Sequence, residues 1–213
     1  IEAIEHFVSE YPEHIYDLSL SNTQSRRSRA GKEFEAILEL LFMGANVSTQ
    51  VQGAIAKQAF AKSGIGKMVD FVSPSVTQYI VDKRNTVLIS AKTTLRERWQ
   101  EVPEEVTRTG IREMYLATLD DRITTETLEI LYESNVIIVT TKRNKAINYS
   151  DNNRIVTFEN LINIMKEANE KWSHYHYTSA DIKAIRKHLE TQRDKHSEHP
   201  YVEAFYQKHL ADL

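Results

Sequence analysis

Asp70 and Lys92 each accompany a short apolar run that is rich in β-branched residues. Asp70 lies within Val69–Val72, and Lys92 directly follows Thr86–Ala91. A carboxylate offers the hard oxygen ligands that magnesium prefers, and an ammonium group can position or activate a water molecule. Hydrolysis of a phosphodiester needs both a metal ion and an activated water. If neighbouring strands carry the two residues, the pair favours a metal-dependent hydrolytic centre.

The apolar pattern predicts the elements that must position this pair. Ala30–Met43 has apolar side chains at helical spacing and is followed by Gly44, so we expect a helix there. The chain from Phe158 onward is also mostly helical in its spacing. The expected strands are Val69–Val72, Tyr79–Asp82, Thr86–Ala91, Met114–Thr118 and Val136–Thr141, the first two forming a hairpin-like pair around Ser73-Pro74-Ser75. The fold class is therefore α/β, with a central mixed β-sheet flanked by helices and a helical C-terminal region.

Length and composition favour one domain. The 213 residues show no repeat and no composition break, so we expect a single domain over 1–213, with a catalytic core at about 25–145 and a helical region at about 158–213. The absence of cysteine excludes disulfides and thiolate zinc sites, and no apolar run is long enough for a membrane helix. A cytoplasmic protein fits. Because the chain opens on Ile1 without an initiator Met, a further N-terminal segment is expected.

The charges are unevenly distributed along the sequence. The formal net charge of −3 argues against a simple nucleic-acid coat, which normally carries a large basic excess. A basic cluster and an acidic cluster lie in different parts of the sequence. This separation fits a surface that binds phosphates in one place and metal ions in another, and it fits an ordinary solvated surface equally well. The basic cluster is Arg26, Arg27, Arg29 and Lys32, and the acidic cluster is Glu101, Glu104 and Glu105.

The spacing around Lys92 matches a nuclease motif. An Asp on one strand followed by residue-x-Lys on a second strand is the PD-(D/E)xK arrangement, although Val69 replaces its Pro and Ser90 its second acid. With the segment after Lys92, and with Arg29-Ala-Gly-Lys-Glu-Phe-Glu35, the chain resembles the restriction endonucleases that read sites with a CC/GG core. This is the group of EcoRII, SsoII and NgoMIV, and the SsoII-like branch that reads CCNGG is the most similar. The resemblance covers residues 29 to 105.

The resemblance implies a restriction-endonuclease-like core and a set of metal ligands. In that group the second acid has moved to the helix after the lysine strand, which places it at Glu105. Glu101 would share a helix face with Glu105 and is the alternative acid. The group also implies Glu35 as an acid near the metals and the Ala91 carbonyl as a further ligand. The implied catalytic residues are Asp70, Lys92 and Glu105, with Mg²⁺ as cofactor.

Arg96-Glu97-Arg98 is a candidate for reading bases. Arginine suits bidentate contact with guanine, and a carboxylate can accept from cytosine N4. In the group that the chain resembles, the matching triplet does this in the major groove. An ion-paired helix surface is the alternative interpretation. Lys67, in a glycine turn, could contact a phosphate, although such a lysine is usually only exposed.

The resemblance implies Mg²⁺-dependent, sequence-specific cleavage of double-stranded DNA, at a CC/GG-core site and most simply at CCNGG. A palindromic site implies a homodimer, because each half-site must meet the same surface. Two alternatives remain open at the level of sequence. One is a repair or junction nuclease on the same fold without site specificity, and the other is a DNA-binding module without activity.

Overall fold

A computed structural model gives the fold of this chain. It describes residues 12–52, 56–66, 69–95, 99–100, 102–103, 106–107 and 112–213, with the backbone alone at residues 12–19 and 22.

A mixed sheet of six strands lies at the centre of the described structure, in the order β1-β2-β3-β4-β5-β6. The strands are β1 (Gln50–Val51), β2 (Phe71–Ser73), β3 (Val87–Lys92), β4 (Met114–Thr118), β5 (Val136–Thr140) and β6 (Ile155–Thr157). β2 is antiparallel to both β1 and β3, whereas β3, β4, β5 and β6 run parallel. The predicted mixed sheet is therefore confirmed, and its parallel strands end at one common edge.

Buried side chains cover both faces of this sheet. Leu88 and Leu116 belong to one buried apolar cluster, and their chain neighbours Ile89 and Ala117 belong to another. Because successive side chains of a strand point to opposite faces, a strand buried on both faces is apolar throughout. This explains why the continuous apolar runs of β3, β4 and β5 could be identified as strands in the sequence.

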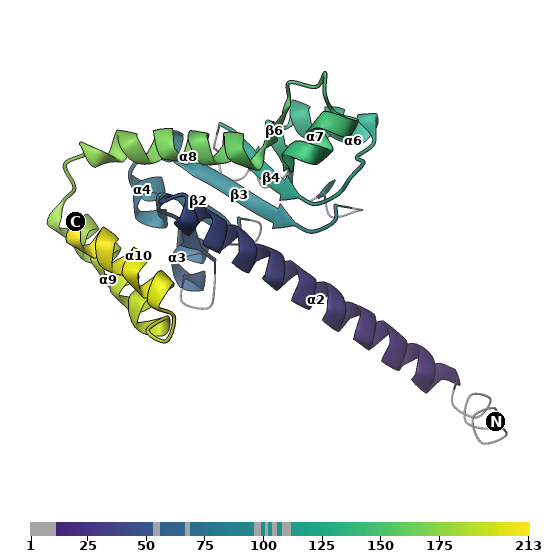
Figure 1. Cartoon of the computed structure of the whole chain (residues 1–213), viewed down its shortest axis with the longest axis horizontal. Coiled ribbons are helices and arrows are strands. Elements are labelled where there is room, and N and C mark those ends of the chain that lie inside the picture. The colour runs from purple at the N-terminus through teal and green to yellow at the C-terminus, as the bar shows by residue number, and fades with distance from the viewer. Residues whose placement is uncertain are drawn as a thin grey trace.

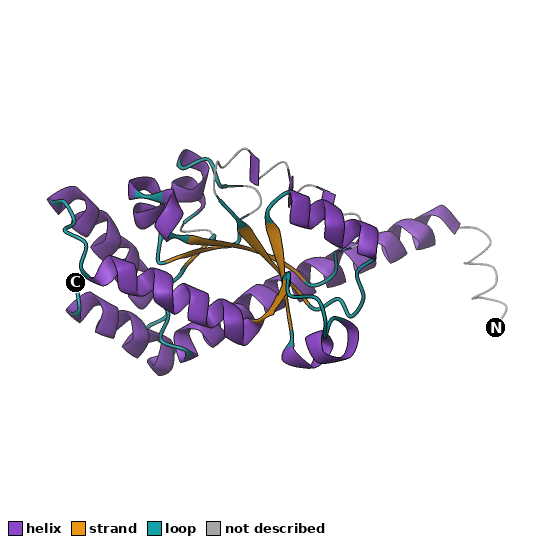
Figure 2. Cartoon of the chain, turned by 90° about the horizontal axis from the view of Figure 1, so that it is seen from above, coloured by secondary structure: helices purple, strands orange, loops and turns teal. Residues whose placement is uncertain are grey.

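Helices pack on each face of the sheet (Figure 2). Those before the C-terminal region are α2 (Pro12–Gly44), α3 (Lys57–Lys62), α4 (Val76–Val81), the 3-10 turn η1 (Lys83–Asn85), α6 (Thr125–Glu133), α7 (Lys142–Asn148) and α8 (Phe158–Ser173). α2 and α8 contribute to the cluster that contains Ile89, and α3, α4 and α6 to the cluster that contains Leu88. The helix expected at Ala30–Met43 is confirmed as part of α2, whose first half projects from the body (Figure 1).

The strand expected at Tyr79–Asp82 is wrong, because this segment lies in and just after α4. Ser75 caps that helix: its side chain accepts a hydrogen bond from the backbone N–H of Thr77. Val76 and Tyr79, three residues apart, are both buried in the core, as one face of a helix requires. There is consequently no hairpin here, and β2 pairs directly with β3.

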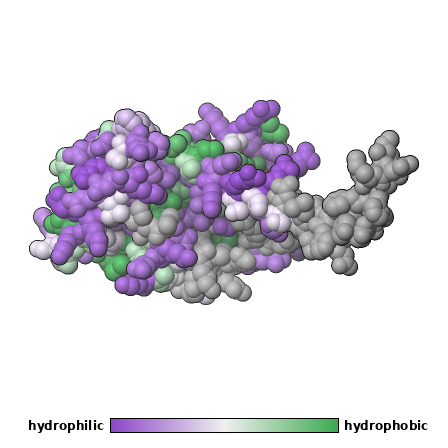
Figure 3. Space-filling model, turned by 90° about the horizontal axis from the view of Figure 1, so that it is seen from below, coloured by the Kyte–Doolittle hydropathy of each residue, from purple (hydrophilic) through white to green (hydrophobic). Residues whose placement is uncertain are grey.

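The C-terminal region is helical, as predicted. α9 (Ser179–Lys195) and α10 (Pro200–Ala211) form a hairpin beside the end of α2 (Figure 1) and share a third apolar cluster with Met43. The surface over this hairpin is largely hydrophilic when seen from below (Figure 3), as expected for helices that bury one apolar face. The indole of Trp172, at the end of α8, donates to the Asn85 carbonyl at 2.7 Å. Within the described ranges, no helix has the length and apolar character needed to cross a bilayer.

Candidate active site

Asp70 lies immediately before β2 and is already bonded to both neighbouring strands. Its N–H donates to the Ile89 carbonyl at 2.9 Å, and its own carbonyl accepts from Gln52 at 2.9 Å. The Asp70 backbone thus extends the sheet by one residue on each side. This fixes its side chain against the end of β3, where Lys92 lies.

The Asp70 carboxylate collects donors from β3. Oδ2 accepts from the Ala91 N–H at 2.6 Å and from the Lys92 ammonium at 3.3 Å. The Ser90 hydroxyl is 3.4 Å from the same oxygen. The side chains of Asp70 and Lys92 are only 13% and 11% exposed. In the described part of the chain, the structure therefore gathers three donors on one carboxylate oxygen at the edge of the sheet.

Ser90 occupies the place where the PD-(D/E)xK motif has its second acid. It is fully buried and adds a hydroxyl donor where the motif would add a ligand. Asp70 is consequently the acid that the two strands supply. Among the described residues, no three His, Cys, Asp or Glu side chains lie close enough to hold a metal ion together. The Asp70 carboxylate offers the hard oxygen ligands that suit a divalent cation, and the candidate second acids Glu101 and Glu105 lie outside the described residues.

Glu35 lies on the helix that packs behind this edge. Its neighbours Phe34 and Leu38 are buried in the same cluster as Ala91 of β3, and Glu35 itself is half-buried. The structure thus places the helix of Glu35 against the strand of Lys92. It does not bring Glu35 into a three-residue metal cluster with other described side chains.

Several predicted site residues lie outside the described residues, and the structure therefore leaves their roles untested. They are Lys67, Arg96, Glu97, Arg98, Glu101 and Glu105.

Asp120 is a residue of this edge that the sequence analysis does not single out. It follows β4, and its Oδ2 accepts from the backbone N–H of Leu95 at 2.5 Å. The available signal was an acidic residue just after a buried strand, since ligand-binding groups gather at the carboxyl ends of parallel strands. This pattern predicts a site residue only once β3 and β4 are known to be parallel neighbours.

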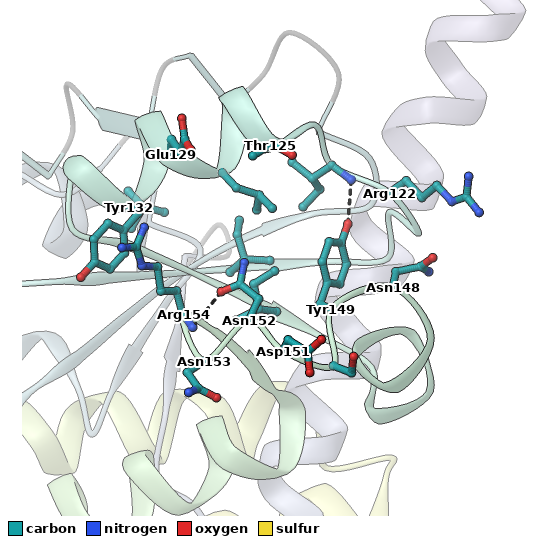
Figure 4. A pocket seen from close by; sticks show the side chains of 16 residues that line it. Arg122, Thr125, Glu129, Tyr132, Asn148, Tyr149, Asp151, Asn152, Asn153 and Arg154 are labelled. Atoms are coloured by element: carbon teal, nitrogen blue, oxygen red, sulfur yellow. Dashed lines mark hydrogen bonds between the residues drawn. The ribbon is translucent and has the colours of Figure 1, made fainter.

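A pocket of the described structure lies beside β5 and β6. It has a volume of about 820 Å³ and is lined by residues of α6, β5, β6 and the loop before β6. Arg154 lies over the ring of Tyr132, 3.6 Å from its centroid, and Tyr149 accepts from the Ile123 N–H at 2.7 Å (Figure 4). Neither Asp70 nor Lys92 lines this pocket.

A mixed sheet with an aspartate and a lysine joined across β2 and β3 defines the restriction-endonuclease-like class. Residues 2–162 match the family model described as the C-terminal domain of EcoRII. The chain is 59% identical over 212 residues to the type II restriction enzyme SsoII of Shigella sonnei, covering 100% of this chain and 70% of that protein. It is 30% identical over 129 residues to EcoRII of Escherichia coli, covering 57% of this chain and 29% of that enzyme.

Solved structures agree with these relatives. Metal-depleted Ecl18kI in complex with uncleaved, modified DNA matches with a TM-score of 0.88 and 57% identity, over 99% of this chain and 69% of that one. The PspGI–substrate DNA complex matches with a TM-score of 0.57 and 22% identity, over 73% of this chain and 67% of that one, a likeness of fold. The chain belongs to the EcoRII C-terminal family of type II restriction endonucleases, which are site-specific deoxyribonucleases that use a divalent metal.

Proposed function

We propose that this chain cleaves double-stranded DNA at a CC/GG-core site, namely CCNGG, with Mg²⁺ as the metal. The observation that carries the proposal is the contact between Asp70, just before β2, and Lys92, at the end of β3, whose charged atoms lie 3.3 Å apart. The identity of 59% with SsoII supports the same site class for this chain. Asp70, Lys92 and Glu105 form its proposed catalytic core.

The metal ligands of the proposal are all oxygens. Asp70 and Glu105 would hold one ion, and Glu35 and the Ala91 carbonyl would contribute to a second ion. When bound, a divalent ion stabilises charge on the phosphate and acidifies a water molecule. Glu101 replaces Glu105 if the helical register differs by one turn.

The residues of the chain itself hold and orient the reacting groups. The Ala91 N–H and the Lys92 ammonium both bind Asp70 Oδ2, so this carboxylate is fixed before substrate arrives. The same contact holds the Lys92 ammonium at the edge of the sheet, where it positions the attacking water or moves its proton. Low exposure of both side chains strengthens these contacts, because surrounding water competes less for the charges.

The remaining roles in the proposal concern DNA. Arg96, Glu97 and Arg98 read the G·C pairs of the core, and Lys67 contacts a phosphate. A palindromic site requires a two-fold homodimer, in which each subunit cuts one strand. We further propose that residues 1–213 form one endonuclease domain, with the catalytic core at about 25–145 and the helical region at about 158–213.

Digestion of two plasmids tests the proposal. One carries several CCNGG sites at known positions, and its matched control has one outer pair changed in each site. With Mg²⁺, the first plasmid should give the discrete fragments of its site map and the second should stay intact. Nicks or random cuts in both would show a nuclease without site specificity. No cutting, together with binding in Ca²⁺, would show a DNA-binding module.

A further inference from the structure

The segments that leave β3 and β4 are joined by one short hydrogen bond. The two strands are parallel, with Lys92 opposite Thr118, so both chains leave the sheet at the same edge. Asp120, two residues after β4, accepts from the backbone N–H of Leu95 at 2.5 Å. A bond to an ionised carboxylate is shorter and stronger than one between neutral groups.

Asp120 is itself firmly held. Its N–H donates to the Thr118 hydroxyl at 3.2 Å, and its carbonyl accepts from the side chain of Asn144 at 2.9 Å. Asn144 is buried and also donates to the Thr140 hydroxyl of β5 at 2.8 Å. The residue whose carboxylate accepts from the Leu95 N–H is therefore itself hydrogen-bonded to β4 and α7, and through Asn144 to β5.

Leu95 is held from its other side by the core. Its side chain is only 2% exposed and packs in the cluster that contains Val102 and Val106. A backbone N–H next to such a buried side chain needs a partner, because an unsatisfied buried donor destabilises the fold. Asp120 supplies that partner, so the position of Leu95 depends on two independent contacts.

In the sequence, Leu95 lies between the proposed catalytic Lys92 and the proposed base-reading triplet Arg96–Arg98. It follows Lys92 by three residues and directly precedes Arg96 in the sequence. We propose that Asp120 is a positioning residue: by binding the Leu95 N–H, it fixes Leu95, the residue that directly precedes the proposed base-reading triplet in the sequence. This inference rests on the proposed function, since it assigns Asp120 a role in that function's site recognition and cleavage.

Three variants test the role of Asp120. D120A removes the acceptor, D120N keeps an amide oxygen that can accept from Leu95, and D121A changes the exposed neighbouring aspartate as a matched control. The first readout is the ratio of Kd values for a CC/GG-core duplex and for the same duplex with one outer pair changed, measured in Ca²⁺. The second is the single-turnover cleavage rate in Mg²⁺ at saturating enzyme, and thermal unfolding is recorded for each variant.

We expect D120A to lower the specificity ratio and the cleavage rate by about tenfold or more, the effect of losing one charge-assisted hydrogen bond. D120N should restore both to within about threefold of wild type, because a neutral acceptor preserves most of the geometry. D121A should change neither.

Two outcomes would overturn the inference. A D120A variant with a lower Tm but an unchanged ratio and rate would show that Asp120 is merely structural. Equal losses in D120N and D120A would show that the negative charge matters rather than the bond to Leu95. A wild-type chain that cuts no plasmid would contradict the proposed function instead, and the binding ratio would still decide the role of Asp120.

Discussion

Lys92 Nζ lies 3.3 Å from Asp70 Oδ2, and the same oxygen accepts from the Ala91 N–H at 2.6 Å. The contact depends on the antiparallel pairing of β2 with β3, which brings the residue before β2 to the last residues of β3. Had the two strands run parallel, Asp70 and Lys92 would lie at opposite ends of the sheet. The direction of one short strand therefore creates the proposed catalytic pair.

Asp70→Asn should abolish cleavage while leaving site-specific binding measurable. The substitution keeps the shape of the side chain and its contact with Ala91, but removes the charge that holds the metal. A loss of several kcal/mol in transition-state stabilisation corresponds to roughly a thousandfold or more in rate. Single-turnover cleavage in saturating Mg²⁺ and binding in Ca²⁺ measure the two effects. Retention of more than a few per cent of the wild-type rate would contradict the assignment.

The contact between Asp70 and Lys92 should also appear as an energetic coupling. Removing one partner leaves the other poorly solvated at about 10% exposure, whereas removing both leaves no charge at that place. D70N and K92M should each destabilise the protein, and the double variant should lose about 1 to 3 kcal/mol less than the sum of the single losses. Urea unfolding of the four proteins gives this coupling energy. Strict additivity would show that the ion pair contributes nothing to stability.

Glu105→Gln and Glu101→Gln should separate the two candidate acids. Replacing the true ligand should reduce cleavage on the scale of Asp70→Asn, roughly a thousandfold or more, because both ligands serve the same ion. The other variant should stay within a few-fold of wild type. Titration of the cleavage rate with Mg²⁺ provides the measurement, since loss of a ligand also raises the metal concentration required. Full activity of both variants would place the second acid elsewhere.

Glu97→Ala should distinguish base reading from an ion-paired surface. If Glu97 accepts from cytosine N4, its loss should reduce discrimination at the outer pairs by roughly 1 to 3 kcal/mol. If it only pairs with arginine, the specificity ratio should stay constant, and binding could strengthen because a negative charge near DNA is gone. Competition binding in Ca²⁺ compares the CC/GG-core duplex with one altered at an outer pair. An unchanged ratio for both Glu97→Ala and Arg98→Ala would exclude the recognition role.

Acid should weaken the attachment of the C-terminal hairpin. His188 of α9 lines a cavity of about 180 Å³ between the hairpin and the body, and burial lowers the pKa of His188 to about 4 from its usual 6.5. As the pH falls below 6.5, the unfolded chain binds a proton that the folded chain excludes, so this contribution to stability is complete above pH 6.5 and is lost toward pH 4.

The expected loss from His188 is about 2 kcal/mol between pH 7 and pH 5, at about 1.4 kcal/mol for each unit of pKa difference. Urea unfolding at the two pH values should show a smaller difference for His188→Leu than for wild type. His176→Gln, at an exposed position, is the matched control and should behave like wild type. Equal pH dependence of all three proteins would show that His188 titrates normally.

Long periodic runs made much of the fold predictable. β3, β4 and β5 are largely apolar because both faces of the sheet are covered, and the helix at Ala30–Met43 shows its buried side in the spacing of Phe34 and Leu38. β1 and β6 span only two and three residues, too few to establish a period. A strand was predicted at Tyr79–Asp82 because β-branched residues are typical of strands. The capping Ser75 and the packing of this segment in the core favour a helix instead.

The candidate site was predictable only where its residues form a motif of recognisable spacing in the sequence. Asp70 and Lys92 belong to a recognisable spacing, and the structure places them in contact. The part played by Asp120 was not predictable, because its partner is a backbone N–H and the contact exists only through the pairing of β3 with β4. A sequence shows which side chains are present, but the neighbours of a strand depend on the whole topology.

The bonds at the site also bear on the order of folding. The contacts of Asp70 with Ser90, Ala91 and Lys92 span 20, 21 and 22 residues, and that of Asp120 with Leu95 spans 25. Among the bonds that join the C-terminal half to the body, that of Trp172 spans 87 residues and that of Tyr177 spans 99. Each doubling of a loop adds about 0.6 kcal/mol of closure entropy. Chain entropy thus favours assembly of the proposed catalytic edge first and docking of the C-terminal helices onto an already formed sheet.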